Sequence, residues 1–243
     1  MLRDISAVVW KEIRELFFAP GNSVRGRILV FIALVGIVVP LQQGLGWLTS
    51  PLAVLLVVMD PVFLVLNVIA DTFAGERERH TLETLLASRL SDRSILFGKL
   101  ITAILYGWGI SLALLVVGLI VVNVTRFSGA FHFYSGEVLL GCLLLGLLMV
   151  TFMSALGILI SLKAPSVRQA QQTLSISFLV IFLGLIYGVQ ALPRDWTANL
   201  LKFAGDISVY GVILILAGVL LVLDFILVNV TLAQFKRSRL MLS

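Results

Sequence analysis

The residues best able to do chemistry gather in one stretch, residues 71–99, which interrupts an otherwise apolar chain with a dense run of charges. Residues 76–79 alternate acid and base, and Ser91-Asp92 offers a cap for the helix that follows. Between them, leucines recur at the spacing of one helical face: Leu82, Leu85, Leu86 and Leu90. The stretch predicts a short amphipathic helix between two membrane spans, suited to docking a partner and passing its motion into both spans. A second interpretation is a solvated loop whose arginines only set the topology.

The chain offers no catalytic constellation by sequence. Gly98-Lys99 is followed by Leu100 and lacks the leading glycine of a phosphate-binding loop, and there is no GxSxG nucleophile motif. The single cysteine, Cys142, lies in an apolar run with no metal-ligand cluster around it. We therefore expect no catalytic residue, metal site or cofactor here. Uphill transport would need either an ion gradient or a separate motor.

The composition is that of a membrane protein. Hydrophobic residues make up 60% of the 243 residues and charged residues 13%, whereas soluble domains have about 45–50% and about 25%. The net charge of +5 follows from where Lys and Arg flank the membrane, so it does not predict nucleic-acid binding. We expect an all-α integral membrane protein with one domain, residues 1–243.

Six apolar segments are long enough to cross roughly 30 Å of hydrocarbon, which takes about 20 helical residues. The segments are 28–48, 51–73, 100–124, 138–162, 174–192 and 208–234. Before them, residues 1–22 predict an interfacial elbow helix in the headgroup plane, with Val8 and Leu16 on its apolar face and Lys11 and Glu12 on its polar face. Residues 193–207 predict a short external helix.

Basic residues fix the predicted orientation. Of the 18 Lys and Arg residues, 15 lie in the N-terminal segment, the loop after the second span (residues 74–99), the loop after the fourth span and the C-terminal tail. Cytoplasmic loops carry an excess of Lys and Arg. Both termini and the 74–99 loop are therefore expected in the cytoplasm, in a multi-pass protein of the plasma (inner) membrane of a prokaryote.

Two acids lie deep in predicted spans, Asp60 in the second and Asp224 in the sixth. An acid there costs about 2.5–3.5 kcal/mol on insertion scales. Asp60, Asn67 and Asp71 fall within roughly 40° of one another on a helix. One interpretation is that Asp60, Asn67 and Asp224 face a translocation path or a subunit interface. The other is that Asp60 is protonated or hydrogen-bonded for structural reasons.

The charged loop resembles the first cytoplasmic loop of ABC transporter type-2 permeases. That family's loop reads roughly E-x-E, then G-T-L-E-x-L-L-x-x-P, then G-K before the third span. The matching residues here are Glu76, Glu78, Thr81, Leu82, Glu83, Leu85, Leu86, Gly98 and Lys99. His80 stands where the family has Gly, and Arg89 where it has Pro.

The resemblance implies a permease that forms a homodimer, or a dimer with a related permease, and binds two copies of an ABC ATP-binding subunit that holds the ATP. Leu82, Leu85 and Leu86 would fill a cleft on the ATPase, with Glu76, Glu78, Arg79 and Glu83 at its rim. Thr81, Gly98 and Lys99 belong to the same loop. The alternatives from the residues are an ion-gradient-driven secondary transporter or channel, and a membrane scaffold. No span carries an aromatic or cationic cluster that selects a substrate.

Overall fold

The computed structural model describes residues 1–18, 24–126, 129–193, 195–196 and 207–235, without the side chains of Leu86, Leu185, Ile186 and Val189. All the regular structure in this part of the chain is helical. The elements are α1 Leu2–Phe18, α2 Val24–Phe31, a π-helical segment Ile32–Val38, α3 Val39–Gln43, a 3-10 segment Gly44–Leu48, α4 Pro51–Glu78, α5 Leu82–Ala87, α6 Asp92–Thr125, α7 Gly136–Leu140, a π-helical segment Gly141–Leu145, α8 Gly146–Ser161, α9 Val167–Gln190 and α11 Val209–Gln234.

Five helical segments among the described residues are long and apolar enough to cross a membrane: Val24–Leu48, Pro51–Glu78, Asp92–Thr125, Gly136–Ser161 and Val209–Gln234. They confirm five of the predicted segments as continuous helices, with shifted ends. The predicted segment 174–192 falls largely in α9, where three side chains lie outside the described set. The external helix predicted at 193–207 lies almost wholly outside the described residues.

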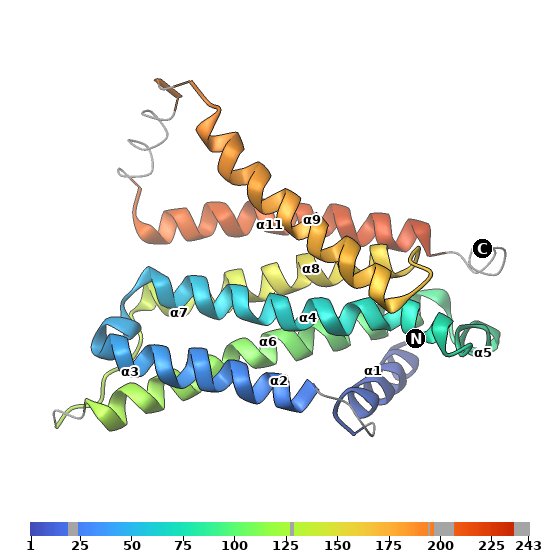
Figure 1. The fold of residues 1–243 in the computed structure, drawn as a ribbon, viewed down its shortest axis with the longest axis horizontal. Coiled ribbons are helices and arrows are strands. Elements are labelled where there is room, and N and C mark those ends of the chain that lie inside the picture. Colours follow the sequence, from blue (N-terminus) through green and yellow to red (C-terminus); the bar gives the residue numbers. More distant parts are fainter. Residues whose placement is uncertain (19–23, 127–128, 194, 197–206, 236–243) are drawn as a thin grey trace.

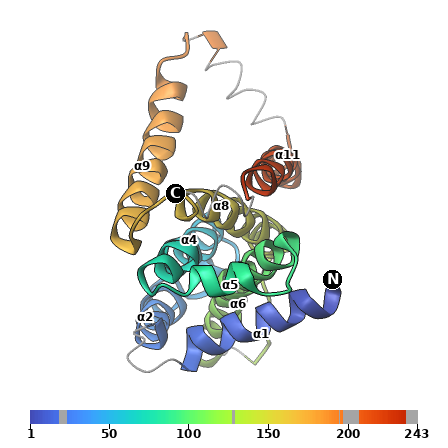
Figure 2. The same ribbon diagram turned by 90° about the vertical axis from the view of Figure 1, so that its right-hand side faces the viewer.

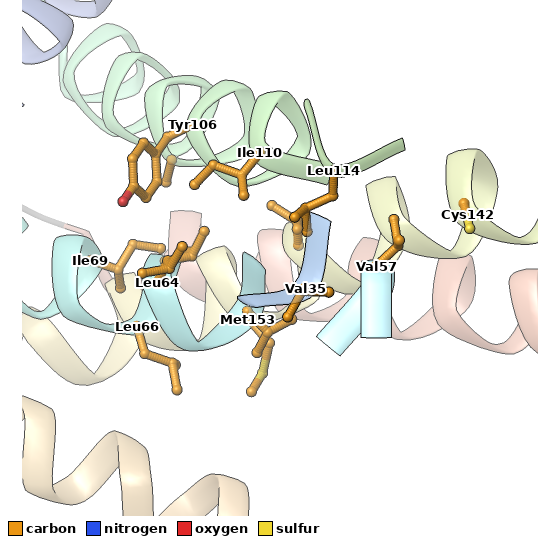
Figure 3. Close-up of a cluster of buried hydrophobic side chains, with 14 of the residues drawn as sticks. Val35, Val57, Leu64, Leu66, Ile69, Tyr106, Ile110, Leu114, Cys142 and Met153 are labelled. Carbon is orange, nitrogen blue, oxygen red and sulfur yellow. The ribbon is translucent and has the colours of Figure 1, made fainter. Parts of the chain in front are cut away.

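The long helices pack side by side around α4, which has α6 and α8 against it (Figure 1). Figure 3 shows the apolar side chains that fill the centre, with Ile69 and Val57 of α4 facing Tyr106, Ile110 and Leu114 of α6. Such a core holds its helices at fixed spacing because its interior is close-packed.

Small residues in α8 let α4 approach closely. Gly157 lies directly on Ile69, with no room for a Cβ atom. Ser161 Oγ accepts hydrogen bonds from the backbone N–H groups of Phe73 and Ala74, both at 3.1 Å, and donates to the carbonyl of Ala70 at 3.0 Å. A polar side chain thus ties α8 to the backbone of α4 near its C-terminal end.

The helix ends at one end of the bundle carry most of the described charged residues. α1, α5, the N-terminal end of α9 and the C-terminal end of α11 lie there together, as Figures 1 and 2 show. Phe235, after the last turn of α11, packs on Phe73 with ring centroids 5.4 Å apart. We call this the α5 end.

The opposite end is closed by hydrogen bonds between the helix connections. Trp47 donates its Nε1–H to the Tyr134 hydroxyl at 3.2 Å, which donates in turn to the carbonyl of Leu115 at 2.9 Å. Asn123 makes two hydrogen bonds to the backbone of His132, at 2.7 and 2.8 Å. Residues 132–134, which lead into α7, are therefore fixed against the bundle.

The close contact at Gly157 generates a stability prediction. We expect Gly157→Ala to lower stability by about 1–3 kcal/mol because the added methyl group overpacks the interface with Ile69. Gly109→Ala is the control, since nothing lies within 4 Å of the Cβ position there. Thermal unfolding in detergent should separate the two variants. Equal melting temperatures would contradict this packing.

Candidate functional site

The short helix α5 forms where the leucine spacing predicted it, between α4 and α6. The next helix, α6, is capped as predicted, because Ser91 Oγ accepts a hydrogen bond from the N–H of Ser94 at 3.2 Å. The apolar face turns inward. Leu82 is 6% exposed and packs in a cluster with Phe73, Ile95 and Leu96. In this structure Leu82 therefore holds α5 to its own chain and does not lie on the surface.

The turn into α5 needs an unusual backbone conformation at His80. Its φ is +54°, the only positive φ of a non-glycine residue in the part of the chain that the structure describes. Glycine adopts this region without cost, whereas other residues pay for it. The departure from the family's Gly at this position therefore keeps the turn and adds strain.

A buried lysine joins three helices beside this turn. Lys99 of α6 is 2% exposed, and its ammonium donates to Glu12 Oε1 at 2.8 Å, Glu76 Oε1 at 2.9 Å and the Thr72 carbonyl at 2.9 Å. It also lies 5.0 Å from the centroid of the Phe73 ring. Three donors meet three acceptors, so the charge is fully compensated, as a buried charge must be. We call Lys11, Glu12, Glu76 and Lys99 the charge network.

Lys11 extends the network toward solvent. Its ammonium lies 3.3 Å from Glu76, 3.5 Å from Glu12 and 3.4 Å from Glu15. Burial opposes the charge on Lys11, but these three carboxylates outweigh it and raise the pKa of Lys11. Burial likewise opposes the charge on Glu12, but Lys99 and then Lys11 outweigh it and hold the pKa of Glu12 below its usual value.

The network corrects the interpretation of α1. The helical spacing predicts Lys11 and Glu12 on a polar face opposite Val8, and of the two only Lys11 is substantially exposed, with 44% of its side chain accessible against 14% for Glu12. Instead, Val8 and Glu12 both face α6, since Val8 is buried against Gly98 and Glu12 reaches Lys99. Positions i and i+4 lie on one helical face, so an inward-facing acid can follow an inward-facing valine. An ion pair 87 residues away in sequence leaves no local signal.

The residues between the network and α5 bind the next helix connection. Arg77 donates to the carbonyls of Leu162, at 3.0 Å, and Ala164, which follow α8. Glu78 accepts a hydrogen bond from the N–H of Val167, the first residue of α9, at 2.9 Å. A cation at a helix C-terminus and an anion at an N-terminus both complement the helix dipole. These two contacts link the α4 end to α8 and α9.

The predicted docking residues thus divide into two sets. Four are buried and form packing or ion-pair contacts within the chain: Glu76, Leu82, Gly98 and Lys99. Five lie at or near the surface: Glu78, Arg79, Thr81, Glu83 and Leu85. Of these, Arg79 pairs with Asp71 at 3.2 Å. The side chain of Leu86 lies outside the described residues.

The predicted path residues do not come together in one contact. Asn67 donates to the Phe63 carbonyl of its own helix at 2.9 Å, and Asp71 pairs with Arg79. Asp224 is 7% exposed on α11, which packs on α8. Neither its carboxylate oxygens nor Oδ2 of Asp60 have a hydrogen-bond partner among the described residues.

These features define a multi-pass helical membrane protein whose charged end carries a short helix between two spans, packed on them through Leu82. A sequence model of the ABC-2 type transporter family matches residues 3–204. The chain therefore belongs to the ABC-2 type transporter family and is a permease component of an ABC transporter, as the resemblance of its loop implied. No curated protein matches the sequence.

The buried lysine generates a second prediction. Lys99→Met leaves Glu12 and Glu76 without their main counter-charge, and breaking such a buried pair costs about 3–5 kcal/mol. The double variant Lys99→Met/Glu76→Gln should be less destabilised than the sum of the single changes. Lys163→Met, at an exposed lysine, is the control. Unfolding in detergent is measured for the wild type, the two single variants, the double variant and the control, and strict additivity would contradict the network.

The lowered pKa of Glu12 generates a third prediction. A carboxyl whose folded-state pKa is depressed stabilises the fold above its unfolded pKa and loses that contribution as the pH falls below about 4.3. We expect the wild-type melting temperature to fall more steeply below this pH than that of Glu12→Gln. Melting curves recorded from pH 6 to about pH 3 test this. Parallel curves for the two proteins would show that Glu12 is not paired in solution.

Proposed function

We propose that this chain is the membrane subunit of an ABC exporter, driven by separate ATP-binding subunits that dock on α5. Two copies of the ATPase would serve a homodimer, or a dimer with a related permease. The chain would cross the plasma membrane of a prokaryote six times, with α9 as the fifth span. α1 would lie at the cytoplasmic interface as an elbow helix, and both termini and the α5 end would face the cytoplasm.

The observation that carries this proposal is the way α5 packs on its own chain. α5 is a six-residue helix anchored by the buried side chain of Leu82, and the charge network lies beside it. Force applied to α5 would reach α4 and α6 directly, α1 through Lys99, and α8 and α9 through Arg77 and Glu78. These contacts suit an element that transfers motion, because helices packed in this way shift as rigid units and do not deform continuously.

The docking surface we propose consists of side chains of α5, and of Thr81 directly before it, that are not buried. Thr81 and Glu83 are exposed, and Leu85 is half-buried at the edge of the apolar face. The buried set, above all Glu76 and Leu82, would support this surface from within. This arrangement modifies the expectation that Leu82 itself enters a cleft on the ATPase.

Asp60, Asn67 and Asp224 remain our candidates for the translocation path. The burial of Asp224 without a partner among the described residues favours a functional role, because intramembrane acids are costly. The same observation favours the second candidate function, a transporter driven by an ion gradient. Transport of a solute into proteoliposomes that contain the chain alone, driven by a pH gradient and without ATP, would support the second function over the first.

The docking proposal predicts the effect of charge reversal on α5. Glu83→Lys should weaken the complex with the ATPase about tenfold, and more at low salt, because rim charges steer association. Glu83 is exposed, so the chain itself should melt unchanged. Glu137→Lys, in α7 at the opposite end, is the matched control. Binding is measured between the purified chain and the ATPase.

Two results would contradict the proposal. One is unchanged affinity and ATPase stimulation for Glu83→Lys. The other is equal weakening by Glu137→Lys, which would show that charge alone, and not its place on α5, matters.

A further inference from the structure

The side of α1 that turns away from the bundle carries arginines and aromatic rings. The exposed residues on this side are Arg3, Trp10, Arg14 and Phe18. At about 100° per residue their side chains fall within about 80° of one another, and Arg3 lies opposite the inward-facing Glu12. We call these four residues, together with the exposed Arg25 of α2, the outer face of α1.

Two arginines of the outer face lie over aromatic rings. The guanidinium carbon of Arg14 is 5.2 Å from the centroid of the Trp10 ring, and that of Arg25 is 5.0 Å from the centroid of the Phe18 ring. A ring face attracts such a cation. Trp10 is 64% exposed and Phe18 70%, so each ring holds its arginine at the surface of the protein.

The acids of α1 are engaged away from these two arginines. Asp4 pairs with the N-terminal ammonium at 3.3 Å, Glu12 with Lys99 at 2.8 Å and Glu15 with Lys11 at 3.4 Å. No ion pair joins Arg14 or Arg25 to a carboxylate within the part of the chain that the structure describes. The outer face therefore presents positive charge that suits an anionic partner.

The position of α1 places this face at the depth of lipid headgroups. The candidate span Val24–Leu48 has 25 residues, about 37 Å of helix, and Arg25 lies in its first turn. A span longer than roughly 30 Å of hydrocarbon has its end turns in the headgroup regions. Phe18 lies beside Arg25, and Val8 packs on Gly98 near the start of α6, so α1 is held at this level along its length.

The orientation of α1 turns the outer face sideways, toward the lipid around the bundle. Figure 2 shows α1 crossing the view at the edge of the bundle, whereas α11 is seen end-on. α1 thus runs across the direction of the spans, with Glu12 toward α6 and Arg14 away from it. The nearest partner for this face is therefore a lipid headgroup.

We propose that the outer face of α1 binds the phosphate of an anionic phospholipid, such as phosphatidylglycerol, through the guanidinium groups of Arg14 and Arg25. A guanidinium group can donate two parallel hydrogen bonds to a phosphate. Trp10 and Phe18 would anchor the face at the interface, where amphipathic helices place their aromatic side chains. This binding rests on the proposed position of α1 at the membrane surface and needs no ATPase.

A lipid competition tests this proposal on the purified full chain. The chain is equilibrated in detergent with equal amounts of phosphatidylglycerol and phosphatidylcholine, and the retained lipid is quantified by native mass spectrometry. Phosphatidylcholine carries the same phosphate, but its trimethylammonium group cancels the charge. The wild type should prefer phosphatidylglycerol about tenfold, and less at high salt. Equal retention of the two lipids by the wild type would overturn the proposal.

Matched variants locate the binding on the outer face. Arg14→Gln/Arg25→Gln should abolish the preference, because it removes both phosphate-binding groups. Arg89→Gln/Arg93→Gln removes the same charge from exposed arginines outside the outer face and should retain the preference. Equal loss in the two double variants would overturn the proposal, since net charge alone would then govern lipid retention.

Two further measurements cover the remaining outcomes. Arg14→Lys/Arg25→Lys keeps the charge but lacks the planar fork, so it should lose part of the preference even if the Gln variant folds poorly. A full preference in the Lys variant would overturn the guanidinium contacts. The competing occupant is an acidic surface of the ATPase. If Arg14→Gln/Arg25→Gln weakens the ATPase complex in lipid-free detergent but leaves the lipid preference unchanged, the outer face binds protein and the proposal is wrong.

Failure of this proposal is distinguishable from failure of the docking proposal. Unchanged ATPase binding by Glu83→Lys would contradict docking on α5 and leave the lipid preference of the chain intact. Loss of the lipid preference in the wild type would leave docking on α5 intact.

Discussion

The structure depends on compensating one buried ammonium, that of Lys99. Removing a charged side chain from water costs several kcal/mol unless well-placed ion pairs and hydrogen bonds replace the lost hydration energy. Here the acceptors come from α1 and α4, while the lysine belongs to α6. The three helices must therefore meet at one place. This requirement, and not the apolar face of α1 alone, fixes how α1 packs against the bundle.

The same end of α4 makes the remaining connections. Within a few residues it supplies Glu76 to Lys99, Arg77 to the end of α8 and Glu78 to the start of α9. Ser161 of α8 completes this with hydrogen bonds to the α4 backbone. α5 follows directly and is anchored by Leu82, which packs against Phe73 of α4 and Ile95 of α6. A partner that moves α5 would thus move the ends of five other helices, which is the mechanical basis of the proposed function.

Much of the fold could be predicted from the sequence because it depends on local patterns. Long apolar segments predicted the long helices, and the leucine spacing predicted α5. Ser91 was predicted to cap the helix that follows, and it caps α6. The positions of Glu12 and Lys99 could not be predicted. Amphipathic patterning assigns charged residues to water, and a buried ion pair reverses that assignment through a contact far away in sequence. The family resemblance implied that Leu82 meets a partner, whereas in the structure its own chain covers it.

The central claim is that Lys99 joins α1 rigidly to the end that carries α5. Spin labels at Ala7→Cys of α1 and Ala87→Cys of α5, both exposed, allow a direct measurement by double electron–electron resonance, with buried Cys142 left in place. If Lys99 holds these elements together, the distance distribution is narrow, is unchanged by Lys163→Met and is clearly broadened by Lys99→Met. Equal widths in all three proteins would show that the buried lysine does not hold these elements together.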